Sequence, residues 1–503
     1  MNLCKRYTVF FASMAQMLAL TAAGCGDDGA GGGTASDGAD EVAETGADAG
    51  GGTQADASSG SDGDATGSGL SGVVATAAVG ELTGNPAAGV ADEAIDCEQV
   101  VSDSDCDDSL RPIVFIHGTF GSATEISKPA MLFGSNGYCQ DRFVAVEYNS
   151  LGGTPAADLA ALVDQVLERT GAEQVDLMGH SQGTGHACTY LSNPDNAAKV
   201  AHYINISGAC AGNGVPTLSL SSSNDIGATT HHSSGDNVEQ VTLGEEDHVA
   251  LAGSRDAFVA MWQYLMGSEP EYTTIQCGEE LITLSGKIVT FGDNVPVADA
   301  VADFFEVDTL EDPRQRPEPA FSLAVAAGGA FNIQVRRGVR YEVRVRKADG
   351  TLLGYGYPGP FERSNYLARF LIESSNPIVA AASTAQAVRG PDHMVLVGRY
   401  IGGAFRADWG NSLKIDGKEV LTSDNAGRNA SVVGLFMYDA NQNGESELGS
   451  SFAAGFVQGT DVFIDASEPR WVEVEWTNEE GQTTELKIGN WPSSENLSSL
   501  TLP

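Results

Sequence analysis

The chain has 503 residues, of which 27 are Lys or Arg and 68 are Asp or Glu, giving a formal net charge of −41 at pH 7. A protein this acidic repels nucleic acid and anionic lipid surfaces, so partners of both kinds are disfavoured. The same charge favours solubility outside the cell.

The N-terminus has the pattern of a secretory signal peptide. Lys5 and Arg6 precede a mainly apolar stretch, residues 7–20, that is shorter than a typical membrane-spanning helix. Residues 20–25 resemble a bacterial lipobox with Cys25 as the lipidated residue, although Ala22 stands where such boxes usually carry leucine. We expect residues 1–25 to be a lipoprotein signal peptide that sends the protein to the cell envelope, at the outer membrane or cell surface. Ordinary secretion is the alternative.

Residues 26–94 consist mainly of Gly, Ala, Ser, Thr and Asp and contain almost no large apolar side chains. Such a segment cannot bury enough surface to offset its conformational entropy, so we expect it to be disordered. A flexible linker of about 70 residues has a root-mean-square span of roughly 45 Å. That length suits a tether that holds a domain clear of a membrane.

Strand and helix patterns alternate through residues 95–270, which predicts an α/β domain with a mostly parallel sheet covered on both faces. A helical stripe runs from Leu159 to Leu167, and Gly171 is placed to cap that helix. The expected strands are 112–116, 143–146, 175–178, 203–206, 217–220 and 238–243.

The sequence Gly179-His180-Ser181-Gln182-Gly183 follows one of these strands and leads into a helix. A G-x-S-x-G motif in that setting is typical of a nucleophile elbow, a sharp turn that needs small neighbours. We therefore expect Ser181 to be a nucleophile. In α/β-hydrolases two backbone N–H groups bind the oxyanion, one after the nucleophile and one in the loop after an earlier strand. Here these are Gln182 and Thr119, the latter in the glycine-rich loop 117–121.

A serine needs a positioned base, and in this fold the order is Ser, Asp or Glu, then His. His248 follows the last expected strand and precedes an amphipathic helix, which is the expected place for the base. Asp225 follows strand 217–220, so it should lie at a strand's carboxyl end, where catalytic groups collect. Asp236 and Asp247 are rivals for the acid, although Asp247 adjoins the histidine and neighbours seldom orient each other well.

Several of these stretches together resemble the smallest secreted bacterial lipases of the α/β-hydrolase fold, lipase class 2. The resemblance covers about residues 110–270 and implies a catalytic triad of Ser181, Asp225 and His248, with oxyanion N–H groups at Thr119 and Gln182. The stretches that carry it are PIVFIHGTFGSA (112–123), VLERTGAEQVDLMGHSQG (166–183), SSSNDIGA (221–228) and DHVAL (247–251).

Six cysteines remain when Cys4 and Cys25 are set aside, and they lie in or beside the α/β domain. Disulfides are expected, because the chain has no C-x-x-C pair and no cysteine–histidine cluster at metal-ligand spacing. Three disulfides allow 15 pairings, and the sequence does not choose among them. The six are Cys97, Cys106, Cys139, Cys188, Cys210 and Cys277.

Period-two alternation replaces the helical pattern after about residue 278. It predicts an antiparallel β-sandwich module over 278–375, with strands near 284–289, 331–335 and 341–345. This part resembles the small transthyretin-like modules of secreted bacterial enzymes. A second β-rich module is expected over 376–503, so the α/β domain should be followed by all-β, sandwich-like modules.

A weak calcium candidate lies in the second module. Asp439, Asn441 and Asn443 have the opening spacing of a calcium loop, with Glu447 at the ninth position. The twelfth position, where an EF-hand needs Glu, is Ser450. A plain Asn-Gly turn is the favoured alternative, and any calcium would be structural. No cofactor is otherwise expected.

Together these features predict a secreted or surface-tethered serine hydrolase, a lipase or esterase that cleaves carboxylic esters through an acyl-enzyme. The site should be open and shallow unless the C-terminal region covers it, because little chain is left between Ser181 and His248 for a lid. A polyester depolymerase or an acyltransferase would use the same residues. An adhesion or binding lipoprotein is a further alternative, in which the β modules bind glycan or a substrate surface and the hydrolase activity is secondary.

Overall fold

A computed structural model of the protein describes residues 97, 100–210, 212–225, 233–315, 317–326, 328–383, 386–428 and 430–503. The signal peptide with Cys25 and the linker 26–94 lie outside the described residues.

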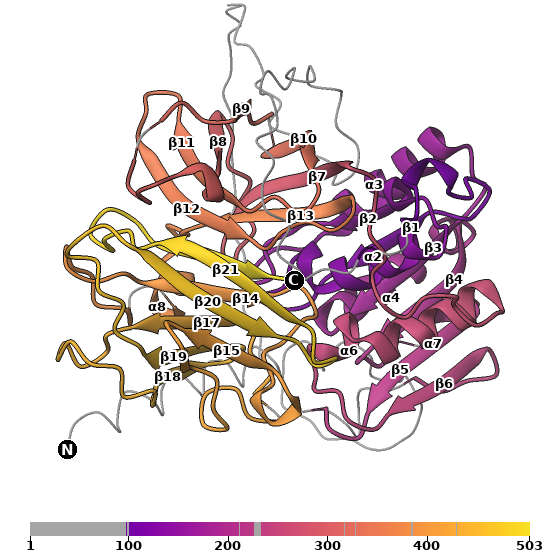
Figure 1. The fold of residues 1–503 in the computed structure, drawn as a ribbon. Helices are drawn as coiled ribbons and strands as arrows, with labels where there is room; N and C mark the ends of the chain where they lie inside the picture. The colour runs from indigo at the N-terminus through magenta and orange to yellow at the C-terminus, as the bar shows by residue number, and fades with distance from the viewer. Residues whose placement is uncertain are drawn as a thin grey trace, which may run out of the picture. The chain divides into compact units, whose positions relative to one another are not determined.

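The α/β domain is built on a six-stranded sheet whose neighbouring strands are all parallel (Figure 1). Each strand predicted from an apolar run is present, with ends that differ by a few residues. The strands pair in the order β2-β1-β3-β4-β5-β6 and are β1 (Ile113–Ile116), β2 (Phe143–Val146), β3 (Val175–His180), β4 (Val200–Ile206), β5 (Thr217–Ser222) and β6 (Val238–Leu243).

Helices pack on both faces of this sheet, as the apolar strands require. Ile113 and Phe115 point to the face covered by α2 (Ser127–Ser135), α6 (Ala250–Gly253) and α7 (Arg255–Met266). Val114 and Ile116 point to the face covered by α3 (Ala156–Thr170) and α4 (Gln182–Leu191), because side chains alternate along a strand. The helix α3 ends at Gly171, whose φ of 69° gives the predicted left-handed cap. The short helix α5 spans Pro194–Ala197.

The rest of the chain is rich in strands. A three-stranded sheet has the order β10-β7-β13, a nine-stranded sheet the order β18-β19-β17-β14-β22-β12-β11-β8-β9, and a four-stranded sheet the order β16-β15-β20-β21. The strands are β7 (Leu281–Thr290), β8 (Ala300–Glu306), β9 (Phe321–Ala324), β10 (Ala330–Arg336), β11 (Tyr341–Lys347), β12 (Leu352–Pro358), β13 (Asn365–Ile372), β14 (Leu396–Tyr400), β15 (Ser412–Ile415), β16 (Lys418–Glu419), β17 (Gly434–Tyr438), β18 (Ser450–Ala454), β19 (Val457–Asp461), β20 (Trp471–Thr477), β21 (Thr483–Gly489) and β22 (Ser498–Leu502); one helix, α8, spans Pro377–Ala382.

The nine-stranded sheet runs through both of the β modules expected from the sequence, 278–375 and 376–503. The last strand, β22, lies between β12 of the first and β14 of the second and pairs with both in parallel. The pair β13–β7 inside the first module is parallel, so the prediction of an antiparallel sandwich was wrong at this place. The pair β17–β19 in the second module is parallel too. Alternation along a strand reveals which face is buried, but it carries no information about the direction of the neighbouring strand.

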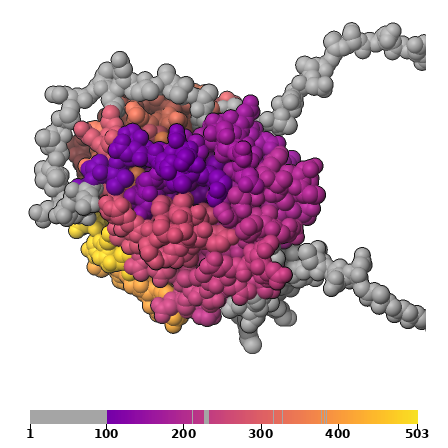
Figure 2. Space-filling view, turned by 90° about the vertical axis from the view of Figure 1, so that its right-hand side faces the viewer, coloured from indigo at the N-terminus to yellow at the C-terminus, as the bar shows by residue number. Residues whose placement is uncertain are grey.

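Three disulfides join the six cysteines, as Cys97–Cys277, Cys106–Cys139 and Cys188–Cys210. All of them lie in the α/β domain or at its two ends, and bonds of this kind are typical of proteins outside the reducing cytosol. Among the helices of the described residues, none is both long and apolar enough to cross a membrane. Figure 2 shows a side on which the α/β domain, coloured indigo to pink, forms most of the coloured surface.

Candidate active site

Ser181 lies at a strained turn between β3 and α4. Its backbone has φ 52° and ψ −120°, a combination that costs a non-glycine residue on the order of 1–3 kcal/mol and persists only where the surroundings enforce it. Close packing enforces it here: a Cβ on Gly183 would lie 2.2 Å from the carbonyl oxygen of Ile116, and one on Gly179 would lie 2.9 Å from that of Gly183. The two glycines of the motif are therefore required by contact with neighbouring backbone.

The side chains of Ser181, His248 and Asp225 form a continuous chain of hydrogen-bonding groups. His248 Nε2 lies 2.8 Å from Ser181 Oγ, and His248 Nδ1 lies 2.8 Å from Asp225 Oδ1. Ser181 follows β3, Asp225 follows β5 and His248 follows β6, so all three come from the carboxyl end of the parallel sheet. His248 is 2% exposed and Asp225 is 6% exposed, which shields their contact from water. This arrangement allows the imidazole to take a proton from the hydroxyl.

Thr119 and Gln182 lie beside each other next to the elbow, with Thr119 Oγ1 donating to Gln182 Oε1 at 3.0 Å. Within the described part of the chain, neither backbone N–H has a protein acceptor, whereas the N–H of Phe120 donates to Ser150 Oγ at 2.9 Å. Gln182 is also the first residue of α4, where the helix end is electropositive. The two N–H groups are therefore available to an anionic oxygen.

Ser207 is a neighbour of the triad that the sequence analysis missed. Its Oγ donates to Asp225 Oδ2 and lies 2.8 Å from His248 Nδ1. It follows β4 directly, and its φ of 52° is positive, as is that of Ser181. The only feature of the sequence that could have pointed to Ser207 is that it is a serine at the end of an expected strand.

A buried pair, His180 and Glu125, supports the site from behind. His180 Nε2 donates to the carbonyl oxygen of His248 at 2.8 Å, and His180 Nδ1 faces Glu125 Oε2 at 3.0 Å. Because both ring nitrogens face oxygen acceptors, the surroundings favour the doubly protonated ring. Burial opposes this charge, but Glu125 outweighs it and raises the pKa of His180, and the pKa of Glu125 is lowered in turn. Glu125 also accepts the N–H of Gly118 at 3.3 Å, so the pair links His248 to the loop of Thr119.

The other acidic candidates have different surroundings. Asp247 accepts the N–H groups of Val249 and Ala250 at 3.0 and 2.9 Å, so it caps the turn into α6. Asp236 is exposed, away from the buried contacts of the triad. Neither side chain replaces Asp225 beside the imidazole.

The strand-rich region reaches this site. The ring of Phe456, between β18 and β19, stacks on the ring of His248 with centroids 5.7 Å apart and planes 12° from parallel. Asn224, beside the triad acid, donates to the carbonyl oxygen of Arg428 at 3.4 Å. The C-terminal region therefore covers one side of the site. The sequence analysis expected an open site unless this region covered it.

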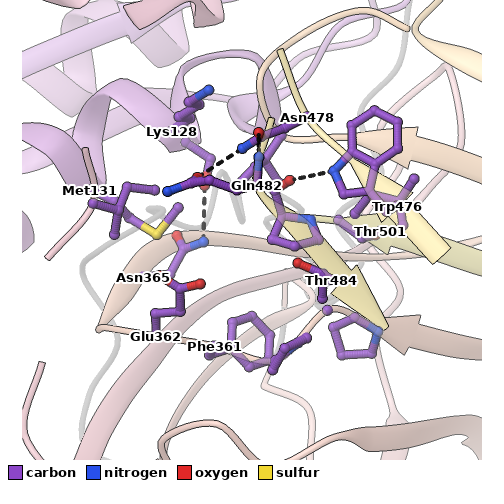
Figure 3. Close-up of a pocket in the computed structure, with 18 of the residues that line it drawn as sticks. Lys128, Met131, Phe361, Glu362, Asn365, Trp476, Asn478, Gln482, Thr484 and Thr501 are labelled. Carbon is purple, nitrogen blue, oxygen red and sulfur yellow. Dashed lines mark hydrogen bonds between the residues drawn. The ribbon is translucent and has the colours of Figure 1, made fainter. Parts of the chain in front are cut away.

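A separate cavity of about 380 Å³ lies where α2 meets the strand-rich region (Figure 3). Lys128 and Met131 line it from α2, and Trp476 and Thr484 line it from β20 and β21. None of the triad residues borders it, so its shape does not define the chemistry at Ser181.

The calcium candidates form a turn closed by their own hydrogen bonds. Asp439 accepts the N–H groups of Asn443 and Gly444 at 3.2 and 2.9 Å, and Asn443 Nδ2 donates to Glu447 Oε1 at 3.1 Å. Asn441 Oδ1 accepts the same Asn443 N–H at 3.0 Å. These bonds fit the plain turn that the sequence favoured, and structural calcium at this loop stays a prediction. Among the described residues, no group of three His, Cys, Asp or Glu side chains is placed to hold a metal ion.

Comparison with known families agrees with the fold. A family model described as alpha/beta hydrolase fold matches residues 113–226, and one described as a lipase C-terminal domain matches residues 280–375. A further model of a C-terminal domain matches residues 399–503. The predicted fold class, an α/β-hydrolase domain followed by strand-rich modules, is thus confirmed, and the family matches support a hydrolase.

Solved structures that match parts of this chain have low sequence identity and low TM-scores. A lipase of Bacillus licheniformis, BlEst2, is 12% identical, with 76% of this chain and 94% of that chain covered and a TM-score of 0.25. Lipase B of Aspergillus fumigatus is 13% identical, covering 33% of this chain and 55% of that one at a TM-score of 0.27. A CIB-like hydrolase of Thermoplasma acidophilum is 16% identical, covering 31% and 87% at a TM-score of 0.25.

Proposed function

We propose that the protein is a serine carboxylester hydrolase, a lipase or esterase that works through an acyl-enzyme. The observation that carries this proposal is the hydrogen-bonded series Ser181–His248–Asp225 at a strained elbow. A hydroxyl, an imidazole and a carboxylate at these distances are the groups that acyl transfer requires.

In the proposed reaction, Ser181 Oγ attacks the ester carbonyl while His248 Nε2 takes the hydroxyl proton. Asp225 holds the Nδ1–H tautomer and stabilises the imidazolium that forms. The N–H groups of Thr119 and Gln182 donate to the oxyanion, and losing one such donor typically lowers the rate about 10²–10³-fold. His248 then protonates the departing alcohol, activates a water molecule and returns the proton to Ser181 as the acid leaves.

We further propose that the protein is exported and held at the cell envelope by a lipid on Cys25. The three disulfides and the signal-like N-terminus support export. The linker 26–94 would then let the enzyme reach esters at some distance from its anchor. Labelling with a radioactive fatty acid should mark the wild type and leave Cys25→Ser unlabelled; equal labelling of both would contradict the anchor.

The direct test of the function is hydrolysis of p-nitrophenyl esters of increasing chain length by the full-length protein. We expect turnover that Ser181→Ala abolishes, and the preferred chain length divides an esterase from a lipase. Ser192→Ala is the matched control, because this serine lies at the exposed end of α4, where its hydroxyl bonds only to the carbonyl oxygen of Thr189. It should keep full activity.

An inactive wild type, or a Ser181→Ala variant as active as the wild type, would overturn the proposal. Product analysis in the presence of an alcohol acceptor, or on a polyester film, separates simple hydrolysis from acyl transfer and from polymer degradation.

A further inference from the structure

Ser207 occupies a position at which both its backbone and its hydroxyl are fixed. Its N–H donates to the carbonyl oxygen of Leu220 at 2.9 Å, which ties the end of β4 to β5. Its φ of 52° turns the chain immediately after that bond, and the residue is 1% exposed. A serine at a left-handed backbone is unusual, because its Cβ is crowded there. Glycine has no Cβ and adopts this conformation at no steric cost.

The fixed hydroxyl touches both members of the acid–base pair. It donates its proton to Asp225 Oδ2, the oxygen that does not face the imidazole, and its own oxygen lies 2.8 Å from His248 Nδ1. Asp225 Oδ1 meanwhile accepts from the same Nδ1–H at 2.8 Å. The three groups thus form a closed ring of contacts in which neither the carboxylate nor the imidazole can rotate without breaking a bond to Ser207.

We infer that Ser207 is a positioning residue of the proposed hydrolase, which holds Asp225 and His248 in the geometry needed to activate Ser181. The inference rests on the proposed function. It assigns to Ser207 no contact with substrate. Its effect is exerted through the carboxylate that orients the base, and it should therefore change kcat and leave KM unchanged.

The substitution Ser207→Gly tests this role without disturbing the backbone. Glycine favours the observed φ, which offsets part of the loss of the buried hydrogen bonds, so the variant should fold while lacking the hydroxyl. We expect kcat for a p-nitrophenyl ester to fall roughly tenfold to hundredfold, the range given by a hydrogen bond to a charged group. KM should stay within about twofold, because substrate contacts are intact.

Ser219→Ala is the matched control. Ser219 is equally buried, and its hydroxyl bonds to Asn205 Nδ2 at 3.3 Å and to the N–H of Ser233 at 2.9 Å, away from the triad. The substitution removes these two bonds and should cost some stability, but kcat should be that of the wild type. A double variant separates positioning from general packing: in an Asp225→Asn background, Ser207→Gly should cause little further loss, because the hydroxyl acts through Asp225.

Two outcomes would overturn the inference while leaving the proposed function intact. One is that Ser207→Gly has the kcat of the wild type although Ser181→Ala, made separately, is inactive. The other is an equal loss from Ser207→Gly in the wild-type and Asp225→Asn backgrounds, which would indicate an independent structural effect. If the wild type itself lacks esterase activity, the proposed function fails first.

Discussion

Replacing Lys128 by methionine should strongly destabilise the protein, because this lysine joins the α/β domain to the strand-rich region through a buried cluster of charges. Its side chain is 8% exposed, and Nζ lies 3.0 Å from both Glu479 Oε1 and Glu480 Oε1. It also donates to the hydroxyl of Tyr400 at 3.1 Å. Burial opposes the charge, but Tyr400 and the two carboxylates outweigh it and raise the pKa of Lys128.

The size of the effect follows from the distances. Two unit charges 3 Å apart attract by about 5 kcal/mol at an effective dielectric constant near 20, and the cost of desolvating each ion offsets much of this. Removing the cation alone leaves Glu479 and Glu480 facing each other at 15% and 13% exposure. Such a loss typically costs 3–5 kcal/mol. Arg406 lies 3.5 Å from Glu479 and still balances part of the charge, so we expect about 3 kcal/mol.

Urea unfolding at pH 7, followed by the fluorescence of the five tryptophans, which include the buried Trp476, measures the difference. Lys414→Met is the matched control: Lys414 pairs with Glu475 nearby, but both side chains are 38% exposed, so solvent screens the pair and only a small loss of stability is expected. A similar small loss for Lys128→Met would refute the reasoning, since it would mean that the buried pairs only balance their desolvation.

The same cluster predicts a pH dependence. Burial acts to raise the pKa of Glu479, but Lys128 and Arg406 outweigh it and lower that pKa to about 2. A carboxylate whose pKa is lower in the folded protein than in the unfolded chain stabilises the fold at pH values above its unfolded pKa, near 4.5. This stabilisation is lost as the pH falls toward 2. The stability of Lys128→Met should therefore decline less steeply than that of the wild type over this window.

Three further substitutions test other features of the structure. Burial raises the pKa of Glu362 to about 7, so the folded protein loses stability relative to the unfolded chain as the pH rises from 4.5 through 7. Thermal melts should therefore show Glu362→Gln equal to the wild type at pH 4 and more stable by about 2–3 kcal/mol at pH 8. Equal melting of the two proteins at pH 8 would contradict the shift. Phe456→Ala should lower kcat/KM for esters about tenfold at unchanged secondary structure, because the imidazole loses its stacked neighbour, whereas unaltered kinetics would make that contact incidental. Gly183→Ala should prevent formation of the elbow, since its Cβ would lie 2.2 Å from the carbonyl oxygen of Ile116; a soluble, fully active variant would show that the turn can relax.

Much of the α/β domain could be predicted because its signals are local. Continuous apolar runs mark strands buried on both faces, and Gly171 marks the end of α3 through its own conformational freedom. The elbow could be predicted for the same reason, because close packing around Ser181 leaves room only for glycine at positions 179 and 183. The proposed roles of the triad residues stay predictions, although the structure does bring Ser181, Asp225 and His248 together.

What escaped the sequence depends on partners far apart along the chain. Ser207 contacts Asp225 and His248 across gaps of 18 and 41 residues, and nothing in its own neighbourhood distinguishes it from other serines. The disulfide Cys97–Cys277 spans 180 residues and was one choice among many. The position of β22 between β12 and β14 depends in the same way on contacts that no local pattern encodes.

The contacts between the two regions argue that the strand-rich part completes the α/β domain instead of being a separate attachment. The side chain of Glu147, which follows β2, is 2% exposed, and its carboxylate lies 2.6 Å from Arg369 on β13. Burial acts to raise the pKa of Glu147, but Arg369 outweighs it and lowers that pKa, so the buried carboxylate is charged because of a partner from the other region. Asn294 Nδ2, just after β7, donates to the carbonyl oxygen of Gly121 at 2.6 Å and thereby fixes the loop that contains Thr119. The strand-rich region thus supplies both the counter-ion of Glu147 and a bond that holds the loop of Thr119, so the geometry near Ser181 depends on both halves of the chain.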